Sequence, residues 1–219
     1  MDAIPAKYLK NMGTYPNINI HGVTVIVYTV SSPTLIDNHI SDFHSHTVTN
    51  KVEVVVLDIV RKLSKTGNSQ QIGSLLVLYA SNRCLIVHLD NISMHPLLAN
   101  FCKTLKDSNI CCVGTAEGIT CTGSLAVKAG ELAAMVLKKP GLIDSTLADL
   151  AREIGVRYDG TSTGTRTEIT VDLRIPTVLS EEMVKIAIRD AVACYQVGCK
   201  LLQLTTINGN SHVKNDDSG

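Results

Sequence analysis

The chain has 219 residues, enough for one sizeable domain and too few for two ordinary ones. Apolar residues make up 45% of it and charged residues 18%, so it has material for a buried core and does not resemble a disordered chain. Lys plus Arg (20) balances Asp plus Glu (20), aromatic residues reach only 4%, and Trp is absent. This composition argues against a broad cationic surface or a base-stacking platform for nucleic acid.

The cellular setting follows from three absences in the sequence. No apolar run approaches the ~18 residues of a membrane span, and the first residues lack the pattern of a secretory signal. We therefore expect an intracellular protein of the nucleus or cytoplasm, with no membrane partner. The seven cysteines are an odd number without a Cys-x-x-Cys pair, which favours reduced core thiols over zinc ligands or disulfides.

The first half of the chain predicts strands. Residues 23–30 (VTVIVYTV) are largely β-branched, and Ser32 with Pro33 supplies an N-cap and a first-turn proline for a helix over about 34–43. Short polar or glycine-bearing segments then join further strand-like runs, which suggests neighbouring strands of one sheet. These runs are 51–59, 72–79 and 83–89.

The second half alternates helices with a strand. A helix over 96–106 precedes a short buried strand over 110–114. Later helical patterns include one with Ser145 as its cap, and the fold class we predict is α/β, a mixed sheet covered by helices. These later patterns are 131–137, 145–154 and 181–202.

We expect a single domain over 21–204, with an N-terminal extension over 1–20 and a flexible C-terminal tail over 205–219. The segment 158–170 is rich in Gly and Thr. Within it, residues 160–165 look suited to phosphate but lack the Lys and the strand–loop–helix setting of a nucleotide loop, so we interpret the segment as a flexible connection.

Several segments resemble a known family. Residues 54–59, then 72–78 leading into Asn82-Arg83-Cys84-Leu85-Ile86, resemble the first strands and the hairpin of Werner-type 3′→5′ exonuclease domains, the plant members especially. The later segments 131–134, 147–153, 179–184 and 190–191 follow in the same order. The resemblance spans about residues 23–202 and implies the ribonuclease-H-like fold of the DEDD exonucleases, and assembly as a ring.

Those exonucleases cut with two metal ions held between carboxylates, and hard divalent ions need oxygen ligands. The first motif is Asp-x-Glu on one strand, where a spacing of two puts both carboxylates on one face. Here Asp58 is kept, but Val60 occupies the Glu position. The last motif is Tyr-x-x-x-Asp on a helix. Here Asp190 is kept, but Ile186 occupies the tyrosine position.

The middle motif, an Asp at a helix start, is also lost. After the 110–114 strand, the positions around Ile119 and Thr120 carry no Asp, and the chain is several residues shorter than its relatives before 131. Glu117 is the one carboxylate nearby; it is either a replacement metal ligand or a surface turn residue.

Each remnant residue has a plain structural alternative. Asp58 is either a relic metal ligand or a strand-end residue paired with a backbone amide or with Arg61. Asp190 is either a ligand or a helix residue held by a salt bridge. Arg61 and Lys62, with Lys65, either contact a phosphate near the cleft mouth or belong to a solvated loop.

Histidines do not change this picture. His39, His44 and His46 are close in sequence, but the five-residue step from His39 to His44 does not place them on one helical face. We therefore do not expect a metal site there.

The leading functional hypothesis is a catalytically degenerate exonuclease-fold protein that acts by binding a protein partner, its own copies or, less favourably, nucleic acid. No cofactor is expected on this hypothesis. The alternative is a weak or altered 3′→5′ exonuclease on DNA or RNA, which uses Mg²⁺ or Mn²⁺ with Asp58 and Asp190 and has Glu117 as a third candidate ligand. A homo-oligomer is implied by the resemblance alone.

Overall fold

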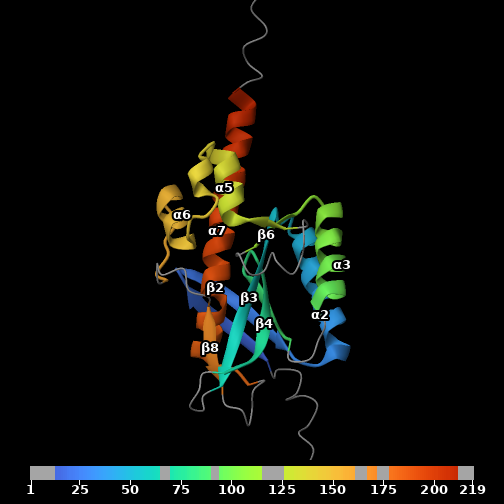
Figure 1. Cartoon of the computed structure of the whole chain (residues 1–219). Helices are drawn as coiled ribbons and strands as arrows, with labels where there is room; N and C mark the ends of the chain where they lie inside the picture. The colour runs from blue at the N-terminus through green and yellow to red at the C-terminus, as the bar shows by residue number, and fades with distance from the viewer. Residues whose placement is uncertain are drawn as a thin grey trace, which may run out of the picture.

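One mixed sheet runs through the molecule, with helices on both of its faces (Figure 1). The computed structural model describes residues 13–64, 70–89, 94–114, 126–160, 167–171 and 178–211, apart from the side chains of 33–34, 94–99 and 207–211. The strand order is β1-β2-β5-β4-β3-β6-β7, and β8 pairs with β3. The strands are β1 (Thr14–Ile20), β2 (Val23–Val30), β3 (Val54–Ser64), β4 (Gln71–Ala80), β5 (Arg83–His88), β6 (Cys111–Gly114), β7 (Val127–Lys128) and β8 (Glu168–Val171).

The helices form two layers. Helices α2 and α3 pack on one face, and α5, α6 and α7 pack on the other. The predicted α/β class, a mixed sheet covered by helices, is therefore confirmed. The helices are α2 (Pro33–Thr49), α3 (Met94–Asp107), α5 (Ala129–Leu137), α6 (Leu147–Ile154) and α7 (Glu181–Ser211), with a 3₁₀ turn η2 (Pro140–Leu142).

The N-terminal segment belongs to the sheet. Residues 14–20, which we expected in an extension, form β1 and pair antiparallel with β2. Ile18 and Ile20 are buried in the core. The sequence signal was weak because Pro16 and two asparagines interrupt the run, and the strand accommodates them with a register irregularity between Tyr15 and Ile18.

Two helix ends differ from the prediction. Helix α2 begins after Ser32 as expected but runs past Phe43 to Thr49, because Ile36, Phe43 and Thr47 continue one buried stripe. In α6 the cap is Thr146, whose hydroxyl accepts from the Asp149 backbone N–H at 3.2 Å, and not Ser145.

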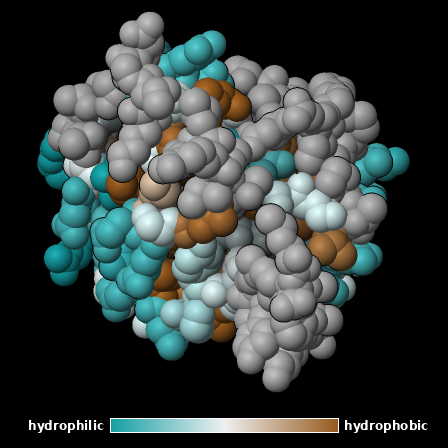
Figure 2. All heavy atoms as spheres, turned by 90° about the horizontal axis from the view of Figure 1, so that it is seen from below, coloured by the Kyte–Doolittle hydropathy of each residue, from teal (hydrophilic) through white to brown (hydrophobic). Residues whose placement is uncertain are grey.

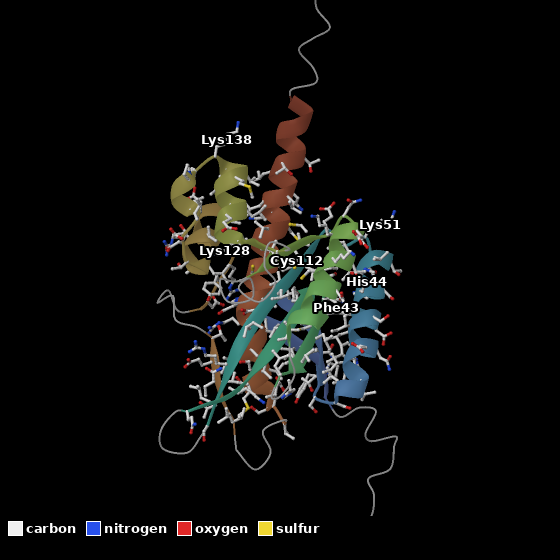
Figure 3. The ribbon with its side chains drawn as sticks, turned by 45° about the vertical axis from the view of Figure 1, so that its right-hand side comes forward. Phe43, His44, Lys51, Cys112, Lys128 and Lys138 are labelled. Atoms are coloured by element: carbon white, nitrogen blue, oxygen red, sulfur yellow. The ribbon has the colours of Figure 1, made fainter. Side chains whose placement is uncertain are left out.

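The α2/α3 face has its own core. The Phe43 ring from α2 lies 6.2 Å from the Phe101 ring, centroid to centroid, and the sulfur of Cys112 in β6 lies 4.0 Å from that of Cys102 in α3 (Figure 3). The six cysteines in the described residues are free thiols, as the sequence predicted.

Helix α7 crosses the opposite face of the sheet at close range. At Gly198, an added Cβ would lie 3.1 Å from a methyl group of Val54 on β3, so the glycine lets helix and strand approach. The helix also extends to Ser211, into the segment we expected as a tail. Among the described residues, every helix falls short of the length and apolarity that a bilayer span requires.

Candidate functional site

The sheet divides beside Asp58. Along one edge of β3, the residues from Val54 to Leu57 pair with β6 and those from Arg61 to Ser64 pair with β8, both parallel. The residues between these two ladders begin with Asp58. One of our two alternatives placed Asp58 at a strand end, and this placement is wrong, because pairing with β4 and β8 carries β3 on to Ser64. Asp58 therefore lies in mid-strand, where the neighbouring strands part.

The Asp58 side chain faces the α7 side of the sheet. Asp58 is two residues from Val56 and from Val60 along β3, so it shares their face of the sheet, and these two valines belong to the core under α7. Asp58 is only 3% exposed. One of its carboxylate oxygens accepts the backbone N–H of Ile59 at 2.8 Å. The backbone-amide alternative for Asp58 thus has a direct structural counterpart. The Val60 side chain is fully buried, so the position that would supply a second carboxylate adds apolar surface.

A buried lysine continues the same face of β3. Lys62 is fully buried, and its Nζ lies 3.5 Å from Nδ1 of His88 on β5. The residue opposite it on the intervening strand β4 is Gly73, which has no side chain to separate the two. Of the two alternatives for Arg61 and Lys62, the solvated loop is wrong, whereas contact with a phosphate stays a prediction. Both lie within β3, since β8 pairs with this part of the strand.

Arg61 points to the other face and is engaged elsewhere. Its guanidinium lies 3.8 Å from the carboxylate of Glu168 on β8. Lys65, its presumed neighbour in a basic cluster, lies outside the described residues. Among the coloured residues of the face seen in Figure 2, hydrophilic and hydrophobic side chains are interspersed.

Asp190 on α7 is held by three donors from its own chain. Tyr158 donates its hydroxyl to Oδ1 at 2.9 Å, Arg189 donates Nε to the same oxygen at 3.1 Å, and Thr167 donates its hydroxyl to Oδ2. The carboxylate is 15% exposed. Burial, and then the Asp190 charge, raise the pKa of Tyr158 to about 12, so this hydroxyl keeps its proton. Asp190 therefore forms an ion pair with Arg189, as in the salt-bridge alternative.

The tyrosine that reaches Asp190 comes from an unexpected place. Ile186, one helical turn before Asp190, is 40% exposed to solvent. Tyr158 and Thr167 come from the segment that we interpreted as a flexible connection, and β8 also begins there. The sequence carried no local signal for this role, because the contact joins residues 32 positions apart.

Asp58 and Asp190 share one neighbour. Cys194, a turn beyond Asp190 on α7, is fully buried. Burial raises the pKa of its thiol, and the charges of Asp58 and Asp190 raise it further. The two remnant carboxylates thus lie in one region, between the opening in the sheet and the middle of α7.

The donors in the described part of the chain do not fit a pair of divalent ions. The described residues contain no group of three or more His, Cys, Asp or Glu side chains that could share one ion. Both Asp190 oxygens are occupied by internal donors, and Asp58 has a backbone donor. Glu117, Ile119 and Thr120 lie outside the described residues.

The three clustered histidines do not converge either. His39 and His46 line a cavity between α2 and the sheet, whereas Nε2 of His44 lies 3.4 Å from the Ser108 hydroxyl at the end of α3. His39 and His44 therefore point to different places, as their five-residue spacing predicted.

The amino-acid sequence matches no protein-family model and no curated protein. In structure, the chain is similar to the catalytic core of RRP6 from Trypanosoma brucei, at 12% identity and a TM-score of 0.48, over 96% of this chain and 56% of that one. It is also similar to the EXD2 exonuclease domain (16% identity, TM-score 0.34, 87% of this chain and 96% of that one). A third similar structure is the Nibbler EXO domain of Aedes aegypti (12% identity, TM-score 0.37, 86% of this chain and 90% of that one).

The chain thus spans about half of the RRP6 catalytic core. At these identities the similarity concerns the fold and assigns no activity. The three structures are named as exonuclease domains or a catalytic core.

Proposed function

We propose that this protein is a degenerate relative of the DEDD 3′→5′ exonucleases that no longer cuts nucleic acid and acts by binding. The observation that carries the proposal is the state of Asp190. A carboxylate whose two oxygens accept from Tyr158, Thr167 and Arg189 is a structural anchor that joins α7 to the chain before β8. A metal ion would have to compete with these donors for the same lone pairs.

The surroundings of Asp58 support the same conclusion. A pair of dications needs several carboxylates at close range. The next position on this face is Val60 and the one after it is Lys62, both fully buried. Hydrocarbon and an amine therefore stand where the chemistry requires additional negative charge.

For the bound molecule we favour a protein partner or a second copy of this chain over nucleic acid. The net charge is +0, which gives little of the phosphate attraction that drives nucleic-acid binding. Near the start of α7, Val178 and Ile186 are 54% and 40% exposed, so apolar surface is available beside the remnant site. A homo-oligomer is one form of this proposal; light scattering after size-exclusion chromatography tests it.

The test of catalysis is a nuclease assay on 3′-recessed DNA and single-stranded RNA with Mg²⁺ or Mn²⁺. We expect no degradation by the wild-type protein. Metal-dependent digestion that disappears in Asp58→Asn would overturn the proposal. Glu168→Gln is the matched control, because it removes a carboxylate from the neighbouring strand while leaving Asp58 and Asp190 intact.

The placement of Asp58 and Asp190 favours a second candidate function, a weak or altered exonuclease. Asp58 and Asp190 both act on Cys194, so the structure has kept two carboxylates in one region. A weak or altered 3′→5′ exonuclease that binds Mg²⁺ or Mn²⁺ would need both of them. Loss of cleavage in Asp58→Asn and in Asp190→Asn, with no loss in the control variant, would favour this candidate.

A further inference from the structure

Two cysteine thiols meet in the core under α2 and α3. The sulfur of Cys102 on α3 lies 4.0 Å from that of Cys112 on β6, and the two thiols share a hydrogen bond (Figure 3). Both belong to the hydrophobic core on this face of the sheet, whereas Asp58 faces α7 on the other. What this pair does is therefore independent of the function proposed above.

Backbone hydrogen bonds fix the end of α3 and the start of β6 beside the pair. The N–H of Ile110 donates to the carbonyl of Leu105 at 2.9 Å, and the N–H of Cys111 donates to the carbonyl of Glu53 at 2.8 Å. A disulfide needs a sulfur–sulfur distance of about 2.05 Å, so these two sulfurs must approach by roughly 2 Å. Rotation of the two side chains about χ1 moves the sulfurs together while the helix and the strand keep their places.

The two thiols differ in acidity. Of the six cysteines in the described residues, five have a thiol whose pKa is raised. Cys102 is the exception, because its hydrogen bond with Cys112 lowers its pKa against the opposite effect of burial. The same hydrogen bond, with burial, raises the pKa of Cys112 well above its ordinary value. The thiolate is the reactive form of a cysteine, so Cys102 is the attacking sulfur and Cys112 is the donor that stabilises it.

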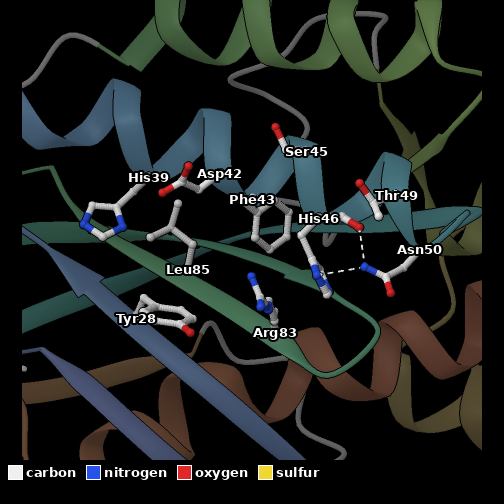
Figure 4. Close-up of a pocket in the computed structure, with 10 residues that line it drawn as sticks. All are labelled: Tyr28, His39, Asp42, Phe43, Ser45, His46, Thr49, Asn50, Arg83 and Leu85. Carbon is white, nitrogen blue, oxygen red and sulfur yellow. Dashed lines mark hydrogen bonds between the residues drawn. The ribbon is translucent and has the colours of Figure 1, made fainter.

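Burial of the pair restricts which oxidant reaches it. Cys102 is 0% and Cys112 is 6% exposed, so a bulky disulfide reagent has no access in the folded protein. Hydrogen peroxide is nearly as small as water and enters through brief local openings. A cavity of about 400 Å³ between α2 and the sheet borders the same core, because Phe43 lines the cavity and packs its ring on Phe101, the residue before Cys102 (Figure 4).

We propose that Cys102 and Cys112 are a redox-sensitive pair, which hydrogen peroxide converts into a disulfide that ties α3 to β6. The Cys102 thiolate attacks one peroxide oxygen, so that an S–O bond forms, the O–O bond breaks and hydroxide leaves. Hydroxide takes the Cys112 proton and becomes water. The Cys112 thiolate then attacks the sulfenic sulfur of Cys102, the S–S bond forms, and the second oxygen leaves as water with the proton that Cys102 first released. Two thiols are oxidised, one peroxide is reduced, and a dithiol reverses the step by exchange.

The test is peptide mapping by mass spectrometry of the full chain treated with hydrogen peroxide. Catalase then removes the peroxide, and the remaining thiols are alkylated in denaturant. We expect a peptide pair linked through Cys102 and Cys112 that separates on reduction with dithiothreitol. Cys111→Ser is the matched control, because Cys111 is the neighbour of Cys112 in β6 and packs on the opposite face of the sheet. This control should keep the link, whereas Cys112→Ala should lose it.

Thermal unfolding measures the effect of the link. The oxidised wild type should unfold about 5 °C or more above the reduced protein, since the bond restricts the unfolded chain, and Cys112→Ala should show no such rise. The wild-type peptide map needs no variant, so it decides the matter even where a variant does not fold. Three results would overturn the proposal: sulfinic acid at Cys102 without a link, a link through Cys111 instead, or an unchanged unfolding temperature of the oxidised protein. Unmodified Cys102 and Cys112, at a peroxide concentration that links them in the unfolded chain, would overturn it as well.

Discussion

Single side chains explain how the remnant site differs from a catalytic one. The sequence resemblance implies a metal-binding glutamate at the position of Val60, which is fully buried, and a tyrosine at that of Ile186, which is 40% exposed. The hydroxyl that Asp190 accepts comes instead from Tyr158, in the chain before β8. Restoring a lost residue type would therefore not restore its setting.

Val60→Glu tests this statement. We expect the substitution to lower the free energy of unfolding by about 3 kcal/mol, because it buries a carboxyl group with no partner prepared for it. Urea unfolding measures the change in stability. The variant should show no nuclease activity in the assay described above. Val48→Glu is the control, since Val48 is 46% exposed on α2 and should tolerate the charge. Equal stability of the two variants would contradict the buried apolar setting of Val60.

Tyr158→Phe tests the Asp190 anchor. Removing the hydroxyl should lower the free energy of unfolding at pH 7 by about 1 kcal/mol, since one hydrogen bond to a charged group is lost. The hydroxyl of Tyr28 makes no hydrogen bond with the described residues, so Tyr28→Phe should cost less. Denaturant unfolding of the three proteins compares these effects.

The same variant carries a pH signature. The pKa of Tyr158 is raised to about 12 in the folded protein, whereas a tyrosine in the unfolded chain titrates near its ordinary value of 10.0. Between these values the unfolded state loses the proton first, so the stability difference between wild type and Tyr158→Phe should shrink as the pH rises from 10 toward 12. A difference that stays constant over this range would contradict the anchor.

At the level of helices and strands, the packing of α7 on β3 organises the site. The small Gly198 brings the helix close to Val54, and the same helix carries Asp190 and Cys194. The strand supplies Asp58 where its β6 and β8 neighbours part. The distance between helix and strand is therefore a property on which the remnant site depends.

Gly198→Leu should destabilise the protein by about 2 kcal/mol, because the new side chain has no room beside Val54 and overpacks the core. Thermal or chemical unfolding measures the loss. Gly141→Ala is the control, since an added Cβ there meets nothing within 4 Å. A neutral Gly198→Leu would show that the helix moves away from the sheet without cost.

For the whole molecule, charge balance is the dominant surface property. Twenty basic and twenty acidic residues give a formal net charge of +0 and a pI of about 7.0. Such a protein has little long-range attraction for nucleic acid and little self-repulsion in solution. This agrees with a role that depends on short-range contacts.

Solubility should accordingly pass through a minimum near pH 7 and rise at pH 5.5, where the seven histidines gain positive charge. Precipitation by polyethylene glycol at a series of pH values measures this. A constant precipitation point between pH 5.5 and 7 would contradict the view that net charge limits self-association.

Periodicity and turn chemistry were sufficient to predict most of the elements. The β-branched runs became β2 to β5, and the apolar stripes became α3, α5, α6 and α7. These patterns are local, because alternation and helical spacing follow from which face of each element is buried. β1, β7 and β8 were missed, since each depends on pairing with a partner strand that supplies what its own residues lack.

The residue types left at the site were also evident in the sequence, which shows two carboxylates with valine and isoleucine at the paired positions. The residues that surround these carboxylates in the folded protein were not evident in the sequence. The donors to Asp190 and the burial of Lys62 against His88 each join residues from separate elements. Contacts of this kind arise only when the sheet and its helices assemble, because no local pattern specifies which distant side chain will meet a given atom.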